Sequence, residues 1–281
     1  MANKGVLKNF YVLALALIVV AAALKLGLAY PTEPVGPNSI TVINSSRLLN
    51  TSYRAKAIWA EAGNISAVAI NATTATRSWQ GYYGNVTGDI VLQDSSNHTL
   101  YNWKEVEPRG EIYAAINTTI NWATIRCFNH TADGGMTWKI ASTISATTEH
   151  SRMNMGNTDP DAINATFNAS RHPAFSVGTV RINQSECYST RTYVNSKAQT
   201  AVDITHEDFI EVLLTDGAPT AGGTNALVFT TFIENRNAYN DTDPIGFDGV
   251  KHDFQMLVLE DGHPGTGEDS PTQYYFWLEL E

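Results

Sequence analysis

The sequence predicts a mainly β protein in which an N-terminal apolar α-helix precedes a large β-sandwich domain, Ig-like or more elaborate. Two observations carry this prediction. An uncharged, almost wholly apolar run extends from Phe10 to Leu24. After Pro31, apolar residues recur mostly at every second position, with turn residues between the runs. Residues 31–281 provide enough chain for one such domain.

The apolar N-terminal segment admits three interpretations. Lys4 and Lys8 precede it, Lys25 interrupts it, and Pro31 stops any helix because proline lacks the amide hydrogen. One interpretation is a secretory signal that is cleaved near Ala29. Another is an uncleaved anchor with its positive end in the cytoplasm.

The third interpretation follows from the segment Lys4-Gly5-Val6-Leu7. It resembles the processing site of archaeal type IV pilin-like proteins. The resemblance implies that a membrane peptidase cuts between Gly5 and Val6, so that residues 1–5 are a leader peptide. Residues 6–30 would then be a hydrophobic helix that anchors the protein in the membrane and later forms a filament core. Residues 31–281 would be an extracellular, glycosylated β-sandwich domain.

Short runs in the body follow the period-two pattern that is typical of strands. In chain order they are Ser39–Ile43, Lys56–Ala62, Ser66–Asn71, Gln80–Tyr83, Asp89–Gln93, Thr99–Trp103, Glu111–Ile116, Ile120–Phe128, Met136–Ile144, Ser176–Ile182, Phe209–Leu214, Ala226–Ile233, Asp253–Leu259 and Gln273–Leu280. Turn residues such as Gly63-Asn64 and Asp94-Ser95-Ser96-Asn97 separate them. One helix is predicted in the body, at Thr158–Ser170, where Asp159 can cap and Pro160 suits the first helical position.

Twelve of the 23 asparagines begin an Asn-X-Ser/Thr triplet, about three times the number that the Asn, Ser and Thr content would produce by chance. Glycans are bulky and confined to surfaces, so the triplets indicate an extracellular glycoprotein. The alternative is that a β protein rich in Thr and Asn forms them by composition alone. The predicted glycosylation sites are Asn44, Asn50, Asn64, Asn71, Asn85, Asn97, Asn117, Asn129, Asn164, Asn168, Asn183 and Asn240.

Charge and cysteine content narrow the class of protein further. The net charge of −10 argues against nucleic-acid binding, which requires basic patches. An even cysteine count in an exported chain predicts one disulfide, Cys127–Cys187, and two free buried thiols are the alternative. No Cys-X-X-Cys-His motif accompanies them, so covalent haem is not expected.

Blocks of aromatic residues in the body also resemble a group of uncharacterised archaeal secreted proteins with a pilin-like N-terminus. One block is Trp79–Gly88 with Leu100–Trp103, and the other joins Gly246–Gly249, Asp253–Val258 and Tyr274–Trp277. The resemblance implies a surface location and supplies no activity. Core and cross-strand packing explain the aromatic residues equally well.

Motifs of the common enzyme classes, such as G-X-S-X-G, H-E-X-X-H and the phosphate loop, are missing from the sequence, so no enzymatic activity is predicted. One acidic loop suggests a calcium site. Asp241 and Asp243 lie close together with Asp248 nearby, and calcium prefers several oxygen ligands. Asp is also common in ordinary turns. Apart from glycans and this calcium site, no cofactor is expected.

The sequence therefore predicts a structural subunit of an archaeal extracellular filament. Its partners would be copies of itself, and the membrane before assembly. Two alternatives stay open. One is a monomeric adhesin or binding module that the same helix anchors. The other is a secreted subunit joined by strand exchange, in which Pro31–Ile43 completes the sheet of a neighbour.

Overall fold

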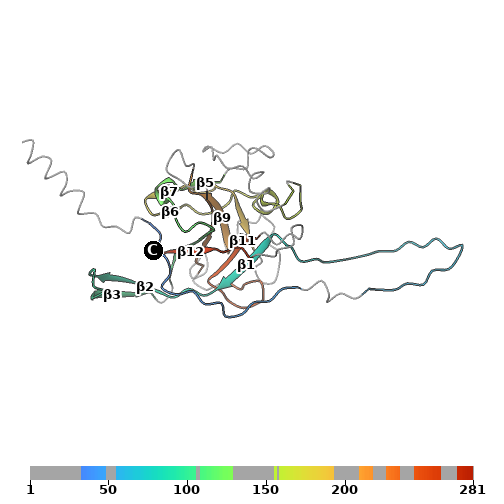
Figure 1. Cartoon of the computed structure of the whole chain (residues 1–281), viewed down its shortest axis with the longest axis horizontal. Helices are drawn as coiled ribbons and strands as arrows, with labels where there is room; N and C mark the ends of the chain where they lie inside the picture. Colours follow the sequence, from blue (N-terminus) through green and yellow to red (C-terminus); the bar gives the residue numbers. More distant parts are fainter. Residues whose placement is uncertain are drawn as a thin grey trace, which may run out of the picture.

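A six-stranded antiparallel sheet forms the centre of the fold (Figure 1). The computed structural model describes residues 33–48, 55–105, 108–128, 155–156, 158–192, 209–217, 226–234, 244–260 and 271–280. Among them the structure is mainly β, with one 3-10 turn and one four-residue α-helix. The predicted fold class, an N-terminal apolar helix followed by a β-sandwich, is therefore wrong. No N-terminal helix is shown, and residues 6–30 lie outside the described residues.

Four strands in the order β12, β4, β10 and β9 make up most of this sheet. They are β12 (Tyr275–Leu280), β4 (Gly110–Ala115), β10 (Leu227–Phe232) and β9 (Ile210–Thr215). The short strands β5 (Arg126–Cys127) and β8 (Ser189–Arg191) both pair with β9. On the far side of β12, Val35 adds a single bridge, in which Val35 and Leu278 exchange two backbone hydrogen bonds.

The central sheet is buried on both faces. Side chains of a strand alternate between the faces, so Ile112 and Ala114 of β4 enter one core cluster while Tyr113 and Ala115 enter another. All six residues of β9 and all six of β10 are buried. Burial on both faces explains why these strands, as sequence, are nearly continuous apolar runs instead of alternating ones.

Smaller elements cover the two faces. On one face lie β1 (Trp79–Gly84) and β11 (Phe254–Leu259), which pair antiparallel, and the helix α3 (Ile163–Thr166). On the other face lie the turn η2 (Trp122–Thr124), β6 (Phe175–Val177) and β7 (Val180–Ile182). Edge-on aromatic contacts join these layers to the sheet, because the edge of one ring is attracted to the face of another. The ring centroids of Trp79 and Phe229 are 6.2 Å apart, and those of Phe175 and Phe232 are 5.1 Å apart.

Buried polar side chains fasten β11 to the sheet. The carboxyl Oε2 of Glu211 accepts the N–H of Leu257 at 2.8 Å, and the hydroxyl of Thr231 donates to the carbonyl of Gln255 at 2.9 Å. Both side chains are fully buried. Burial raises the pKa of Glu211 well above its ordinary value, since desolvation disfavours the charged carboxylate.

The strand predicted at Ile120–Phe128 is wrong in extent, because the segment forms the turn η2 and then the two-residue strand β5. Two other predicted elements differ from the structure for reasons of tertiary pairing. The helix predicted at 158–170 is wrong in extent, because α3 spans only Ile163–Thr166. Asp159 does not cap this helix, because its carboxylate accepts the N–H of Gly156. Ala169 then bridges to Ser189, which requires an extended chain after Phe167. Ser176–Ile182 is two strands, because Gly178 with φ +55° turns the chain between β6 and β7.

Three further predicted strands have a different outcome. The structure has no strand at Ser39–Ile43, Lys56–Ala62 or Ser66–Asn71. The residues of these segments are exposed, and their trace is extended (Figure 1). Met136–Ile144 lies outside the described residues. The short strand β8 had no corresponding prediction, because three residues are too few for a visible alternation.

Candidate assembly surface

Exposed apolar side chains are concentrated on two parts of the molecule that project from its body. Twenty large apolar residues of the described chain are exposed. Five of them lie between Ile58 and Ile70, six lie on β2 and β3, and five others lie between Val35 and Leu48. Large exposed apolar patches in proteins mark interaction sites, whereas single exposed apolar residues are ordinary. The two projections are therefore the candidate functional site.

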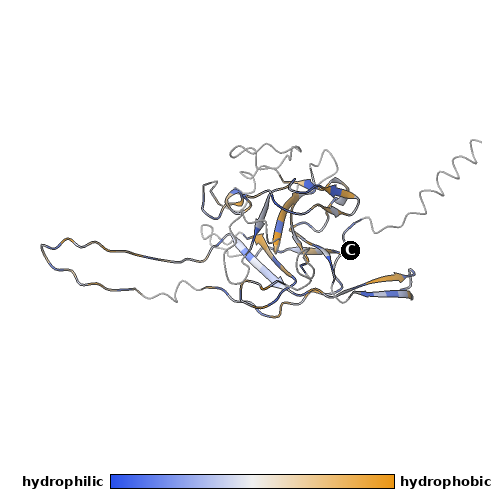
Figure 2. Ribbon diagram, turned by 180° about the vertical axis from the view of Figure 1, so that it is seen from behind, coloured by the Kyte–Doolittle hydropathy of each residue, from blue (hydrophilic) through white to orange (hydrophobic). Residues whose placement is uncertain are grey.

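The first projection is an arm, which we define as residues 55–75. It extends far from the body as two roughly parallel traces (Figure 1). Its apolar side chains are fully or largely exposed: Trp59 and Ile65 are at least as exposed as in a free chain, and Ile70 is 87% exposed. Figure 2 shows apolar segments in orange along this arm.

Local sequence explains the turn at the tip of the arm. Gly63 has φ +87°, a conformation that costs glycine little. The N–H of Asn64 donates to the carbonyl of Glu61 at 3.2 Å, and its side-chain amide donates to the Glu61 carboxylate at 3.1 Å. The bond from the N–H of Asn64 to the carbonyl of Glu61 is the one backbone-to-backbone hydrogen bond within the described arm. The two legs of the arm, 55–62 and 65–71, therefore run beside each other without a ladder of hydrogen bonds (Figure 1).

The end of the arm that returns to the body is held firmly. The Ser78 hydroxyl donates to the Asp161 carboxylate at 3.0 Å, and the hydroxyl of Thr76 donates to the same oxygen. The indole N–H of Trp79 donates to the carbonyl of Asp161 at 2.7 Å. The arm is thus anchored at its base while its legs contact no other described strand through hydrogen bonds.

The second projection is a ribbon formed by β2 (Gly88–Gln93) and β3 (Thr99–Glu105). It is a separate two-stranded sheet that points away from the body (Figure 1). Its residues divide by side. On one face, Ile90 lies opposite Trp103 and Leu92 lies opposite Tyr101. On the other face, the carboxylate of Asp89 accepts a hydrogen bond from the side-chain amide of Asn102 at 3.1 Å.

The apolar face of the ribbon is uncovered. Leu92, Tyr101 and Trp103 are each about half exposed, and the rings of Tyr101 and Trp103 contact each other with centroids 4.6 Å apart. In Figure 2 the strand β2 is largely orange, which marks it as apolar. An isolated two-stranded ribbon is marginally stable in water unless a further strand or layer joins it.

Asp94 organises the turn between β2 and β3. Its carboxylate accepts the N–H groups of Ser96 and His98, each at 2.9 Å, and its other oxygen contacts the His98 ring at 2.9 Å. These hydrogen bonds, chiefly the one from the backbone of His98, lower the pKa of Asp94. Asn97 adopts φ +64°, which Asn tolerates better than most residues.

The predicted calcium site is only partly visible. Asp241 and Asp243 lie outside the described residues. The Asp248 carboxylate accepts the N–H of Val250 at 3.0 Å and contacts the Nε2 atom of His252 at the same distance. The Val250 hydrogen bond is the main cause that lowers the pKa of Asp248. Among the described residues, no three His, Cys, Asp or Glu side chains lie close enough to hold a metal ion.

The aromatic residues around this loop pack against one another. His252 lies against the ring of Tyr83 with centroids 4.7 Å apart, and Phe247 contacts Tyr83 at 4.8 Å. The side-chain oxygen of Gln255 accepts the N–H of Phe247 at 2.8 Å. The loop is therefore fixed to β1 and β11 by its own side chains, and its aromatic block is explained by packing.

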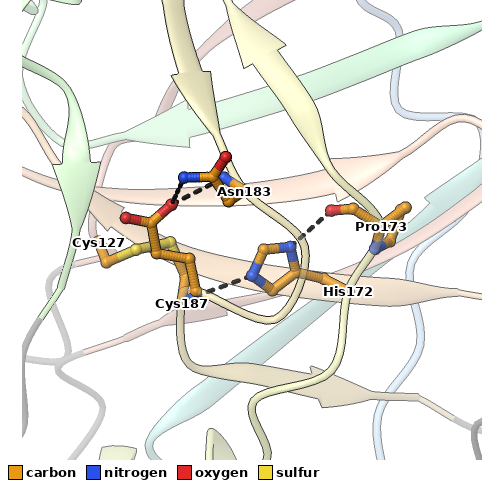
Figure 3. The surroundings of a disulfide bond; sticks show 6 residues. Cys127, His172, Pro173, Asn183 and Cys187 are labelled. Atoms are coloured by element: carbon orange, nitrogen blue, oxygen red, sulfur yellow. Dashed lines mark hydrogen bonds between the residues drawn. A yellow bond between two sulfur atoms is a disulfide. The ribbon is translucent and has the colours of Figure 1, made fainter. Parts of the chain in front are cut away.

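The predicted disulfide between Cys127 and Cys187 is present in the structure (Figure 3). Both residues are buried and 60 positions apart in the chain. Both flank β9: Cys127 pairs with Leu214, and the carbonyl of Tyr188 accepts the N–H of Leu213. The bond is consistent with an oxidising, extracytoplasmic environment.

The described glycosylation triplets lie on the surface. Seven of the asparagines are exposed and two, Asn117 and Asn164, are half-buried. The exposed ones are Asn44, Asn64, Asn71, Asn85, Asn97, Asn168 and Asn183. Asn50, Asn129 and Asn240 lie outside the described residues, as do the processing residues Gly5 and Val6. The surface positions leave glycosylation sterically open, and it stays a prediction.

Comparisons of the chain with protein-family models, with curated proteins and with solved structures found no match. The similarity to archaeal type IV pilin-like proteins therefore stays a prediction. None of the helices in the described part of the chain is long and apolar enough to cross a membrane.

Proposed function

We propose that this protein is an extracellular structural subunit that assembles with copies of itself into a filament. One observation carries the proposal: more than half of the exposed large apolar side chains of the described residues lie on the arm and the ribbon. The proposal keeps the self-assembly that the sequence analysis predicts. It replaces an N-terminal helix with β projections as the surface through which copies meet.

The physical argument begins with the cost of leaving these groups in water. Apolar side chains such as Trp59, Ile65 and Ile70 gain about 25 cal/mol for each Å² that a partner removes from water. The backbone groups of the legs and the outer edges of the ribbon can also form ladder hydrogen bonds with another strand. Both projections therefore favour association with a β-structured partner.

The arrangement of the two projections favours a homopolymer. The arm and the ribbon leave the body in opposite directions, as the two views agree (Figures 1 and 2). A subunit with different adhesive surfaces at its two ends makes head-to-tail contacts, and such contacts generate open filaments when the rotation does not close a ring. The disulfide and the surface triplets suit a subunit that works outside the cell.

Sedimentation and negative-stain electron microscopy of the full-length natural protein test this function. We expect pelletable, elongated polymers that appear above a threshold concentration and dissolve on dilution. A monodisperse monomer over the whole accessible concentration range would contradict the proposal. If that monomer bound a foreign surface, the result would favour the alternative of an adhesin.

A further inference from the structure

Resting on the self-assembly proposed above, we infer that the arm of one copy pairs with the β2–β3 ribbon of the next copy. The two legs of the arm would add as strands to the open edges of the ribbon and place their apolar side chains beside those of its apolar face. The occupant of the ribbon is thus a second copy of this chain, and the segment that it contributes is residues 55–71.

The ribbon has the form of an incomplete sheet that accepts strands. Neither β2 nor β3 pairs with any other strand of the described chain, so each keeps one edge open. Four apolar side chains share one face, through the cross-strand pairs Ile90–Trp103 and Leu92–Tyr101. The opposite face is mixed: Val91 lies opposite Asn102, and Asp89 lies opposite Lys104.

The arm has the form of a donor. If the return leg pairs as a strand, the spacing of Val68 and Ile70 would place both on one face and Ile65 on the other. Both legs are extended, yet between described residues their backbone groups form one hydrogen bond, the Asn64–Glu61 contact at the tip. An extended apolar segment with unsatisfied ladder groups is the usual ligand in strand addition.

The dimensions of donor and acceptor agree. The legs have eight and seven residues, and β2 and β3 have six and seven. At about 3.3 Å per residue, legs and strands all span roughly 20–26 Å. The contact would involve fewer residues than the roughly 20–30 a side of a standard interface. Each subunit makes it twice, once through its arm and once through its ribbon.

A second copy fits better than the chain's own arm. The arm and the ribbon project from opposite sides of the body, and the base of the arm is held by Asp161 (Figure 1). The base of the ribbon is held as well, because the N–H of Val86 donates to the Asp253 carboxylate at 2.6 Å. With both bases fixed on the body, the arm would meet the ribbon of a neighbour rather than its own.

The triplets at the two tips are compatible with this pairing. Asn64 lies at the turn of the arm and Asn97 at the turn of the ribbon. A glycan at either turn extends beyond the end of the strands and leaves their edges and the apolar face of the ribbon accessible.

A complementation experiment with two variants of the full chain tests the pairing. The arm variant carries Val68→Lys and Ile70→Lys, and the ribbon variant carries Tyr101→Lys and Trp103→Lys. An ammonium buried in an apolar contact lacks a partner, so each pair should weaken the contact by at least about tenfold. All four side chains are more than half exposed, so the fold of each variant should persist.

The expected result is specific to a head-to-tail contact. Each variant alone should stay monomeric in analytical ultracentrifugation. An equimolar mixture should form a one-to-one dimer that does not grow, because the intact arm of the ribbon variant enters the intact ribbon of the arm variant. Matched controls are Ala72→Lys with Thr74→Lys, which are exposed on the arm beyond the pairing segment, and Ser95→Lys with Ser96→Lys, which are exposed in the turn of the ribbon. Both controls should polymerise like the natural protein.

Other outcomes overturn the pairing. Dimers of the arm variant alone would mean that ribbons pair with ribbons, and dimers of the ribbon variant alone that arms pair with arms. Two folded variants that stay monomeric when mixed would also overturn it. Polymerisation of both variants would place assembly on another surface, and the proposed function would survive. A natural protein that never polymerises would overturn both the pairing and the proposed function. Near-ultraviolet circular dichroism would show whether each variant is folded.

Discussion

At the scale of single residues, His172 shows how a buried side chain can depend on one protonation state. Its Nε2 atom accepts the N–H of Cys187 at 2.9 Å, and its Nδ1 atom donates to the carbonyl of Pro173 at 2.7 Å (Figure 3). The neutral Nδ1–H tautomer satisfies both contacts. A protonated ring would place a second N–H against the N–H of Cys187. Burial also lowers the pKa of His172, because desolvation disfavours the charged ring.

This residue predicts a pH dependence of stability with a definite sign. The folded pKa of His172 lies below the unfolded value of about 6.5, so the unfolded state binds more protons in the interval between them. The stability that the neutral His172 ring contributes is therefore fully present above pH 6.5, the unfolded pKa, and is lost as the pH falls through the folded pKa. We expect His172→Gln, which keeps one donor and one acceptor, to reduce the loss of unfolding free energy between pH 7.5 and 5.5.

Urea denaturation at the two pH values measures this effect. The matched control is His98→Gln, because the His98 side chain is 82% exposed on the ribbon turn. The control should keep the pH dependence of the natural protein. An unchanged slope in His172→Gln would show that other groups cause the acid sensitivity.

At the scale of elements, Gly110 permits the close approach of β4 and β12. Its φ is +126°, and a Cβ atom there would lie 1.9 Å from the carbonyl oxygen of Glu279. No side-chain rotation relieves that contact, because both atoms are fixed by the backbone. The carbonyl of Gly110 also accepts the N–H of Ile233, so a shift would disturb β10 as well.

We therefore expect Gly110→Ala to destabilise the protein by about 1–3 kcal/mol or more, the usual cost of backbone strain with a steric clash added. The measurement is the free energy of unfolding in denaturant. Gly36→Ala is the control, because no atom lies within 4 Å of the position of its Cβ. Equal stabilities of the two variants would mean that β12 moves away from β4 without cost.

At the scale of the whole molecule, the surface positions of the triplets predict an order of glycan occupancy. Asn117 and Asn164 are half-buried, whereas Asn64, Asn85 and Asn97 are exposed in or beside turns. A glycosylating enzyme needs access to the side-chain amide, so exposed sites should carry more glycan than the two half-buried ones. Mass spectrometry of glycopeptides from the natural source gives the occupancy at each site. Empty exposed sites would reduce the triplets to a consequence of composition.

The distribution of apolar surface also belongs to the whole molecule. The central sheet buries its side chains on both faces, yet the arm and ribbon leave theirs in water. Under the proposed assembly, association between copies would give these residues the buried environment that the body gives to Phe229 or Leu213.

The sequence predicted strands best where the structure supplies a neighbour. The patterns at Phe209–Leu214, Ala226–Ile233 and Asp253–Leu259 correspond to β9, β10 and β11. The same pattern at Ser66–Asn71 produced a prediction that is wrong, because no strand in the described chain lies beside it. The even cysteine count likewise predicted a disulfide, but the positions of β5 and β8 along the same edge of β9 bring the two sulfurs together.

By itself the sequence determined the extended backbone of these segments, the side chains that share a face, and the turns at Gly63 and Asp94. These are local properties, set by dihedral preferences and by hydrogen bonds between residues close in the chain. Only the tertiary structure decided which extended segments become paired strands and which remain uncovered. A ladder needs a second strand at about 4.8 Å, and the alternation of one segment contains no information about what lies beside it.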